Sequence, residues 1–137
     1  PYGGILMFKG VDHVVIAVSD LEAAIKQYET VYDIEVSDRG EPPGAGFRNA
    51  HFRFADTFLE LISPIAEDGP VAKRLAASGE GVYLVAMRVD NIEETAARLR
   101  DNGVRLLGDP GPGKPITGQL FIHPAFAGGV LTQVVQR

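Results

Sequence analysis

A histidine and a glutamate, at positions 13 and 60, stand in surroundings that favour acid–base chemistry. Glu60 lies in the segment FLELIS, where strand alternation puts Phe58 and Ile62 on the same face as its carboxylate. A carboxylate between apolar neighbours is costly to bury unless it is paired. Pairing with His13 raises the pKa of the imidazole and lowers that of the carboxyl group, so no metal is needed. We therefore expect His13 and Glu60 to form an acid–base couple.

Both residues also have interpretations that involve no chemistry. A partly buried histidine often does no more than hydrogen-bond a backbone carbonyl, and a glutamate on an edge strand is often simply solvated. His51 is a further candidate, because it lies on a neighbouring predicted strand and on the same face as Arg53. Alternation alone does not tell which face of that strand looks into a cleft.

The segment that carries His13, HVVIAV, alternates and is rich in β-branched residues, so it predicts a strand over 13–18. A helix is expected directly afterwards, because Ser19 and Glu22 have the S-x-x-E spacing of a capping box. The apolar residues of that helix share one face, as their i, i+4, i+7 spacing shows: Leu21, Ile25 and Tyr28.

The same pattern returns 71 positions later, where Val89 corresponds to Val18. Asp90 and Glu93 give a second capping signal, and Asn102-Gly103 ends the second helix. Its apolar face repeats the first: Ile92, Ala96 and Leu99. The repeat places Leu84 where the first copy has His13.

Short alternating segments separated by glycine and proline follow each helix, so each half predicts strand, helix and then about three strands. A duplication of this kind favours an α+β fold of two βαβββ modules. The predicted organisation is an extension or cloning remnant at 1–7, a first module at 8–66, a linker with one short helix at 67–80 and a second module at 81–137.

Composition excludes several classes of partner. The net charge of −5, with basic residues scattered among acids, argues against nucleic acid. No apolar run approaches the roughly 20 residues that span a bilayer. The chain has no cysteine, so disulfides and thiolate sites are excluded, which is compatible with a reducing compartment. We expect a cytoplasmic protein that binds a small molecule.

Several segments resemble the vicinal oxygen chelate superfamily, which includes glyoxalase I, extradiol dioxygenases, methylmalonyl-CoA epimerase and bleomycin-resistance proteins. VDHVVIAVSDLEAAIKQYETVYDIEV, LELISP and FIHPAFAGGVLTQVV are most similar to the epimerase branch. The resemblance implies curled mixed sheets around a shared cleft, and a homodimer. Ligand-contacting positions on the first and last strands of each module fall on His13, Glu60, Leu84 and Gln133.

Members of the superfamily that bind a divalent metal usually place His, Glu or Gln at these positions. Leu84 offers no donor, so a metal would have His13, Glu60 and Gln133, and Gln133 donates only a neutral amide oxygen. His51, on a neighbouring predicted strand, is the candidate to replace the missing metal ligand. We expect no cofactor and no tightly bound metal.

The chain departs from the epimerases at two further positions. The loop glutamate of the family falls near Pro43 and Gly44, and its C-terminal carboxylate is replaced by Gln133. These losses, with that of the metal donor, argue against methylmalonyl-CoA epimerase activity itself.

Three hypotheses follow. The first is an acid–base isomerase or lyase for a small carboxylate or acyl thioester, with His13 and Glu60 catalytic and Gln133 orienting an oxygen. Its predicted cleft is lined by Leu84, His51, Phe58 and Arg48. The alternative is a non-catalytic, metal-free ligand-binding or drug-sequestering protein. The third is a metal-dependent epimerase, lyase or dioxygenase with an altered ligand set.

Overall fold

The structure, a computed structural model, describes residues 6–137. Within it the chain forms two compact units. The first unit is residues 13–83, and the second joins residues 6–12 with residues 84–137. The predicted extension therefore lies mostly outside the described residues. Its boundary, and the module boundaries at 66 and 81, stay predictions. Among the described residues no helix has the length and apolar character needed to cross a membrane.

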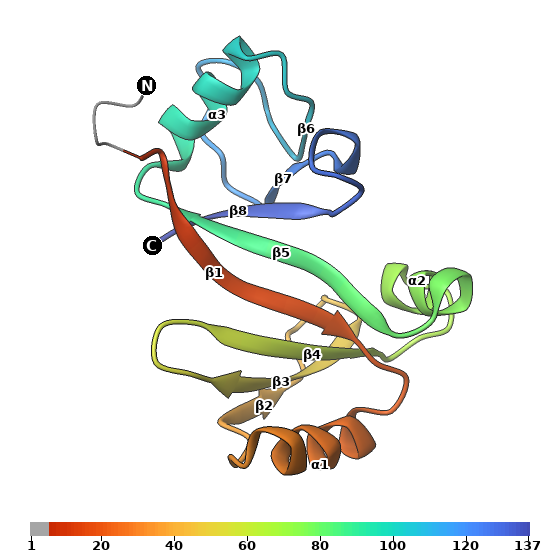
Figure 1. Ribbon diagram of the computed structural model, residues 1–137. Helices are drawn as coiled ribbons and strands as arrows, with labels where there is room; N and C mark the ends of the chain where they lie inside the picture. The colour runs from red at the N-terminus through yellow and green to blue at the C-terminus, as the bar shows by residue number, and fades with distance from the viewer. Residues whose placement is uncertain (1–5) are drawn as a thin grey trace. The chain divides into compact units, whose positions relative to one another are not determined.

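The first unit is a mixed sheet with a helix on one face (Figure 1). Its strand order is β2-β3-β4-β1, with β1 parallel to β4 and the other neighbours antiparallel. Its elements are β1 (Phe8–Ala17, entering the unit at His13), α1 (Leu21–Tyr32), β2 (Asp38–Gly40), β3 (Phe47–Arg53), β4 (Phe58–Pro64) and α2 (Pro70–Ser78).

Helix α1 covers the sheet with the face that the sequence predicts. Leu21 and Ile25 are buried and Tyr28 packs beside them, against Phe52 of β3 and Leu61 of β4. Because side chains alternate along a strand, the residues between these core positions point to the opposite face of the sheet. Packing of α1 therefore decides which residues of β3 and β4 are left for chemistry.

Both helix starts differ by one residue from the predicted capping boxes. The N-cap of α1 is Asp20, whose carboxylate accepts from the Ala23 amide, while the amide of Ser19 donates to Glu80. Helix α3 (Ile92–Asp101) is capped in the same way by Asn91. Asp and Asn are strong N-caps in their own right, so they compete successfully with the S-x-x-E pattern.

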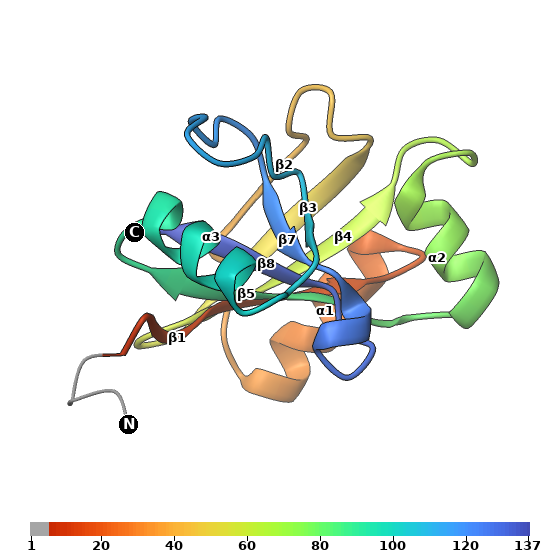
Figure 2. The ribbon, with the colours of Figure 1, turned by 90° about the horizontal axis from the view of Figure 1, so that it is seen from above.

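The second unit repeats the arrangement, with strand order β5-β8-β7-β6 and β5 parallel to β8. Figure 2 shows α3 alongside β8, and Val89, Ala96, Leu120 and Val134 form the core between helix and sheet. The remaining elements are β5 (Gly81–Val89), β6 (Leu106–Leu107), β7 (Leu120–Ile122), a 3-10 turn (Pro124–Phe126) and β8 (Thr132–Gln136).

Strand register confirms the internal repeat. Val15 of β1 pairs with Glu60 of β4, and Ala86 of β5 pairs with Gln133 of β8. His13 and Leu84 each precede the paired residue of their strand by two positions, so they occupy equivalent places in the two sheets. The predicted α+β class with two related mixed sheets is confirmed.

An ion pair at the end of α3 gives a prediction for stability. Arg100 donates to both carboxylate oxygens of Asp109, each at 2.7 Å, and the Gly111 amide donates to one of them at 3.0 Å. Mainly through Arg100, these contacts hold the pKa of Asp109 at about 2, below its ordinary 3.8. The stabilisation is complete above pH 3.8 and is lost as the pH falls through about 2.

Asp109→Asn should therefore lower the midpoint of urea unfolding at pH 7, and its difference from the wild type should shrink as the pH falls below 4. Urea titrations followed by circular dichroism at pH 7, 5 and 3 measure this. A difference that does not change with pH would show that the ionised carboxylate is not the stabilising group.

Candidate functional site

The face of the first unit's sheet that α1 does not cover gathers polar side chains from four neighbouring strands. On β3, Asn49, His51 and Arg53 alternate with the core residues Ala50 and Phe52. Cross-strand partners extend the same face onto β4, β1 and β2: Phe58 and Glu60, His13, and Asp38.

Glu60 is at the centre of this cluster, and its side chain is only 14% exposed. Its Oε1 lies 3.8 Å from Nε2 of His13, and its Oε2 lies 3.6 Å from Nε2 of His51. Asn49 Nδ2 donates to Oε2 at 3.0 Å. Burial opposes ionisation of Glu60. The interactions with His51 and Asn49 and the charge of His13 outweigh burial, so the pKa of Glu60 lies below its ordinary value.

The expected pair of His13 and Glu60 is therefore brought together, at a separation longer than a hydrogen bond. The direction predicted for the Glu60 pKa is confirmed, but its main favourable cause is His51 rather than His13. The sequence suggested His51 only as a cleft residue and a spare metal donor. In the structure it is the closer imidazole to Glu60.

His51 also contacts a second carboxylate. Its Nδ1 lies 2.5 Å from Oδ1 of Asp38, and the side chain of His51 is 19% exposed. The Glu60 carboxylate raises the pKa of His51, burial opposes this, and Asp38 raises it further, so the net shift is upward. Burial would raise the pKa of Asp38, but His51 and Arg53 together hold it below its ordinary value. His51 therefore lies between two carboxylates, both of which favour its protonated form.

Phe58 provides the apolar wall of the cluster. Its ring stacks on His13, with 4.4 Å between centroids and 10° between planes, and meets the edge of His51 at 5.1 Å. The Arg53 guanidinium lies 4.9 Å from the centroid of the same ring. Phe58, which the sequence predicts only as a cleft residue, thus contacts the rings of both imidazoles.

Asp38 and Asn49 were missed by the sequence reasoning. A signal for Asn49 was present, because polar residues at 49, 51 and 53 alternate with apolar ones at 50, 52 and 54. That pattern indicates one covered and one polar face. Asp38 had no such signal, because β2 is three exposed residues long and does not alternate.

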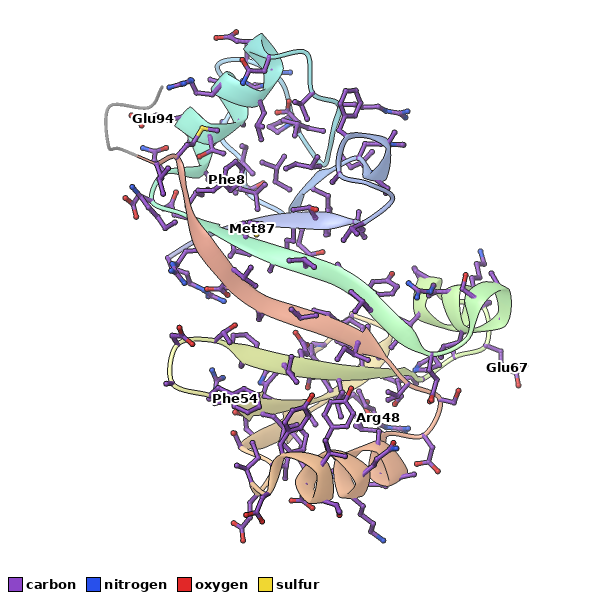
Figure 3. All side chains as sticks on the ribbon, viewed as in Figure 1. Phe8, Arg48, Phe54, Glu67, Met87 and Glu94 are labelled. Carbon is purple, nitrogen blue, oxygen red and sulfur yellow. The ribbon has the colours of Figure 1, made fainter. Side chains whose placement is uncertain are left out.

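The structure does not bring Arg48 to this cluster. Arg48 is on β3 between Phe47 and Asn49, so it points to the face that carries Ala50 and Phe52 (Figure 3). Its guanidinium donates to Glu41 at 3.1 Å, and more than half of its side chain is exposed.

Leu84 and Gln133 belong to the second unit. Leu84 is buried on β5, and Gln133 is partly buried on β8 in register with Ala86. A pocket of about 790 Å³ in the same unit lies between the start of β1 and α3, where Phe8, Lys9, Thr95 and Arg98 are among its lining residues. None of the predicted site residues lines that pocket.

The donor set does not fit the divalent metal of the superfamily. Over residues 6–137, no three His, Cys, Asp or Glu side chains are arranged to hold a metal ion. Oε2 of Glu60 and Nδ1 of His51 already have protein partners, and the position equivalent to His13 is the aliphatic Leu84. That no metal binds stays a prediction.

Comparisons with known proteins agree with this architecture. The sequence profile of the glyoxalase-like domain matches residues 11–120. The ethylmalonyl-CoA/methylmalonyl-CoA epimerase of Cereibacter sphaeroides is 33% identical over 136 residues, which are 95% of this chain and 99% of that protein.

Solved structures are similar too. The methylmalonyl-CoA epimerase of Mycobacterium tuberculosis superposes with a TM-score of 0.82 at 32% identity, over 97% of this chain and 93% of that one. A methylmalonyl-CoA epimerase in complex with methylmalonyl-CoA and NH4+ superposes with a TM-score of 0.81 at 34% identity, over 94% of both chains. Because these relatives are isomerases, the expectation of an enzyme rather than a non-catalytic binding protein is confirmed. The chain belongs to the glyoxalase-like family of the vicinal oxygen chelate superfamily.

Proposed function

We propose that this enzyme moves a proton at the carbon next to the carbonyl of a small acyl thioester, without a tightly bound metal. The observation that carries the proposal is the ionised, largely buried Glu60 carboxylate between the imidazoles of His13 and His51. The names of the relatives, which act on or bind branched malonyl-CoA esters, support the substrate class.

In the proposed reaction Glu60 accepts the proton of the substrate carbon. The electron pair of the broken C–H bond moves towards the carbonyl oxygen and forms an enolate. A protonated His13 then gives a proton back to the same carbon, and transfer of the proton from Glu60 to His13, 3.8 Å away, restores both groups. In its protonated form His51 favours the negative charge that passes from Glu60 to the enolate.

A cation near the reacting carbonyl is what the superfamily's metal supplies, as the resemblance implies. Here the two imidazoles and the Asn49 amide are the groups that surround the carboxylate. They supply electrostatic stabilisation by fixed groups, which costs no reorganisation during the reaction. The dialysed protein should therefore remain active.

Deuterium exchange tests the proposal. Purified protein is dialysed against a chelator and incubated in D2O with methylmalonyl-CoA, ethylmalonyl-CoA or free methylmalonate, beside enzyme-free controls. Mass spectrometry should show one deuterium gained at the substrate carbon of a thioester, faster than in the control. Return of every compound without enzyme-dependent exchange would contradict the proposal. Activity that disappears on dialysis and returns with Co²⁺ would contradict its metal-free part.

A further inference from the structure

A row of three charged side chains crosses the sheet of the first unit at right angles to its strands. Asp38 of β2 is the direct partner of His51 of β3, and His51 is the direct partner of Glu60 of β4. Direct cross-strand partners have Cβ atoms about 4.5–5.5 Å apart and point to the same face. The register of three strands therefore builds a carboxylate–imidazole–carboxylate chain from residues that are distant in sequence.

Both nitrogens of His51 face carboxylates in this chain. Nδ1 lies 2.5 Å from Asp38 and Nε2 lies 3.6 Å from Glu60. A neutral imidazole has one N–H, so one of its lone pairs would face a carboxylate, whereas the doubly protonated ring presents an N–H to each. The geometry therefore favours the imidazolium form.

The outer end of the chain is held as well. Arg53 donates from Nε to Oδ2 of Asp38 at 3.3 Å, and its guanidinium rests on the ring of Phe58. The groups that face His51 are therefore Asp38 on β2, Arg53 on its own strand, and Glu60 and Phe58 on β4, with His13 of β1 beyond Phe58.

These contacts give the two carboxylate oxygens of Glu60 different surroundings. Oε2 accepts from Asn49 and faces His51, while Oε1 is turned towards His13. An oxygen that already accepts a hydrogen bond and has an imidazole 3.6 Å away is the weaker base of the two. Oε1 is therefore the oxygen better placed to accept a proton.

We propose that Asp38 and His51 are positioning residues, which hold Oε2 of Glu60 so that Oε1, on the His13 side, is the oxygen that takes the substrate proton. This inference rests on the proposed function for its kinetic part. Asp38 acts through His51, and His51 acts through Glu60. Arg53 holds Asp38 in turn.

Asp38→Asn tests the carboxylate–imidazole–carboxylate chain of Asp38, His51 and Glu60. The amide keeps the shape but presents no negative charge to Nδ1, so the imidazolium is less favoured and Asn49 is left as the main hold on Oε2 of Glu60. We expect kcat for exchange to fall about 10-fold or more, less than the effect of removing a general base itself. KM should stay within about 2-fold, since Asp38 is not a binding residue. Asp38→Glu, which restores a carboxylate, should recover part of the loss.

Nitrogen NMR of protein labelled with ¹⁵N-histidine provides a readout that needs no substrate. Both nitrogens of His51 should be protonated at pH 7 in the wild type, and in Asp38→Asn one of them should lose its proton at a lower pH than in the wild type. Asp109→Asn is the matched control, because it removes a carboxylate from an ion pair in the other unit and should leave both kcat and the His51 signals unchanged.

Two results would overturn the positioning role. One is a wild-type His51 with a single protonated nitrogen. The other is an Asp38→Asn variant with unchanged kcat. If the wild type incorporates no deuterium into any thioester but His51 is doubly protonated, the proposed function is wrong. The arrangement of Asp38, His51 and Glu60 is then still supported.

Discussion

Glu60→Gln should slow deuterium exchange about 100- to 10,000-fold, the range that a general base contributes. The substitution keeps the volume of the side chain and an oxygen that accepts from Asn49. It removes the negative charge and the proton-accepting capacity next to His13 and His51. Because the loss concerns the transition state, kcat should fall while KM changes little. Initial rates of exchange in D2O with the best thioester of the panel measure both parameters.

Glu67→Gln is the matched control for this change. Glu67 is an exposed glutamate in the loop before α2, and Figure 3 shows its side chain directed away from the ribbon. The same chemical replacement should leave exchange at the wild-type rate there. Exchange in Glu60→Gln that equals the wild type would exclude Glu60 as the base and leave the cluster with a structural role.

The sequence could predict the strands that carry His13 and Glu60 because their neighbours alternate or are continuously apolar. It could also predict their equivalence to Leu84 and Gln133, since the offset of the repeat is visible in residues that pack, such as Val18 and Val89. Residues that pack recur at a regular spacing, so they locate the strand in the sequence. The site positions within the strand are then located with it.

The partners of Glu60 could not be predicted in the same way. The contact of Asp38 with His51 depends on the register of a three-residue edge strand, and no pattern inside such a short exposed strand specifies its neighbour. Arg48 shows the converse. Its charge suggested a ligand contact, but the alternation set by Ala50 and Phe52 turns it to the helix-covered face. Charge alone therefore did not identify the residues that face Glu60, because the core residues of β3 decide that Asn49 and His51, and not Arg48, lie on its side.

Phe52→Ala should lower the free energy of unfolding by about 3–5 kcal/mol, the cost of emptying a fully buried aromatic position. Phe52 has no exposed surface and lies under α1, with its ring centroid 5.8 Å from that of Tyr28. The same substitution at Phe54 should cost about 1 kcal/mol, since Phe54 is 38% exposed and its ring contact is a single edge-on pair with Tyr32. Urea unfolding at pH 7 measures both variants.

The comparison of these two phenylalanines tests the orientation of the whole site. Phe52 lies on the face of β3 opposite His51, so a large loss at Phe52 is the result expected from the register that turns Asn49 and His51 towards Glu60. Equal small losses would mean that α1 does not seal this face. The register of β3 could then shift by one residue. Such a shift would move His51 to the other face of the sheet, away from Glu60.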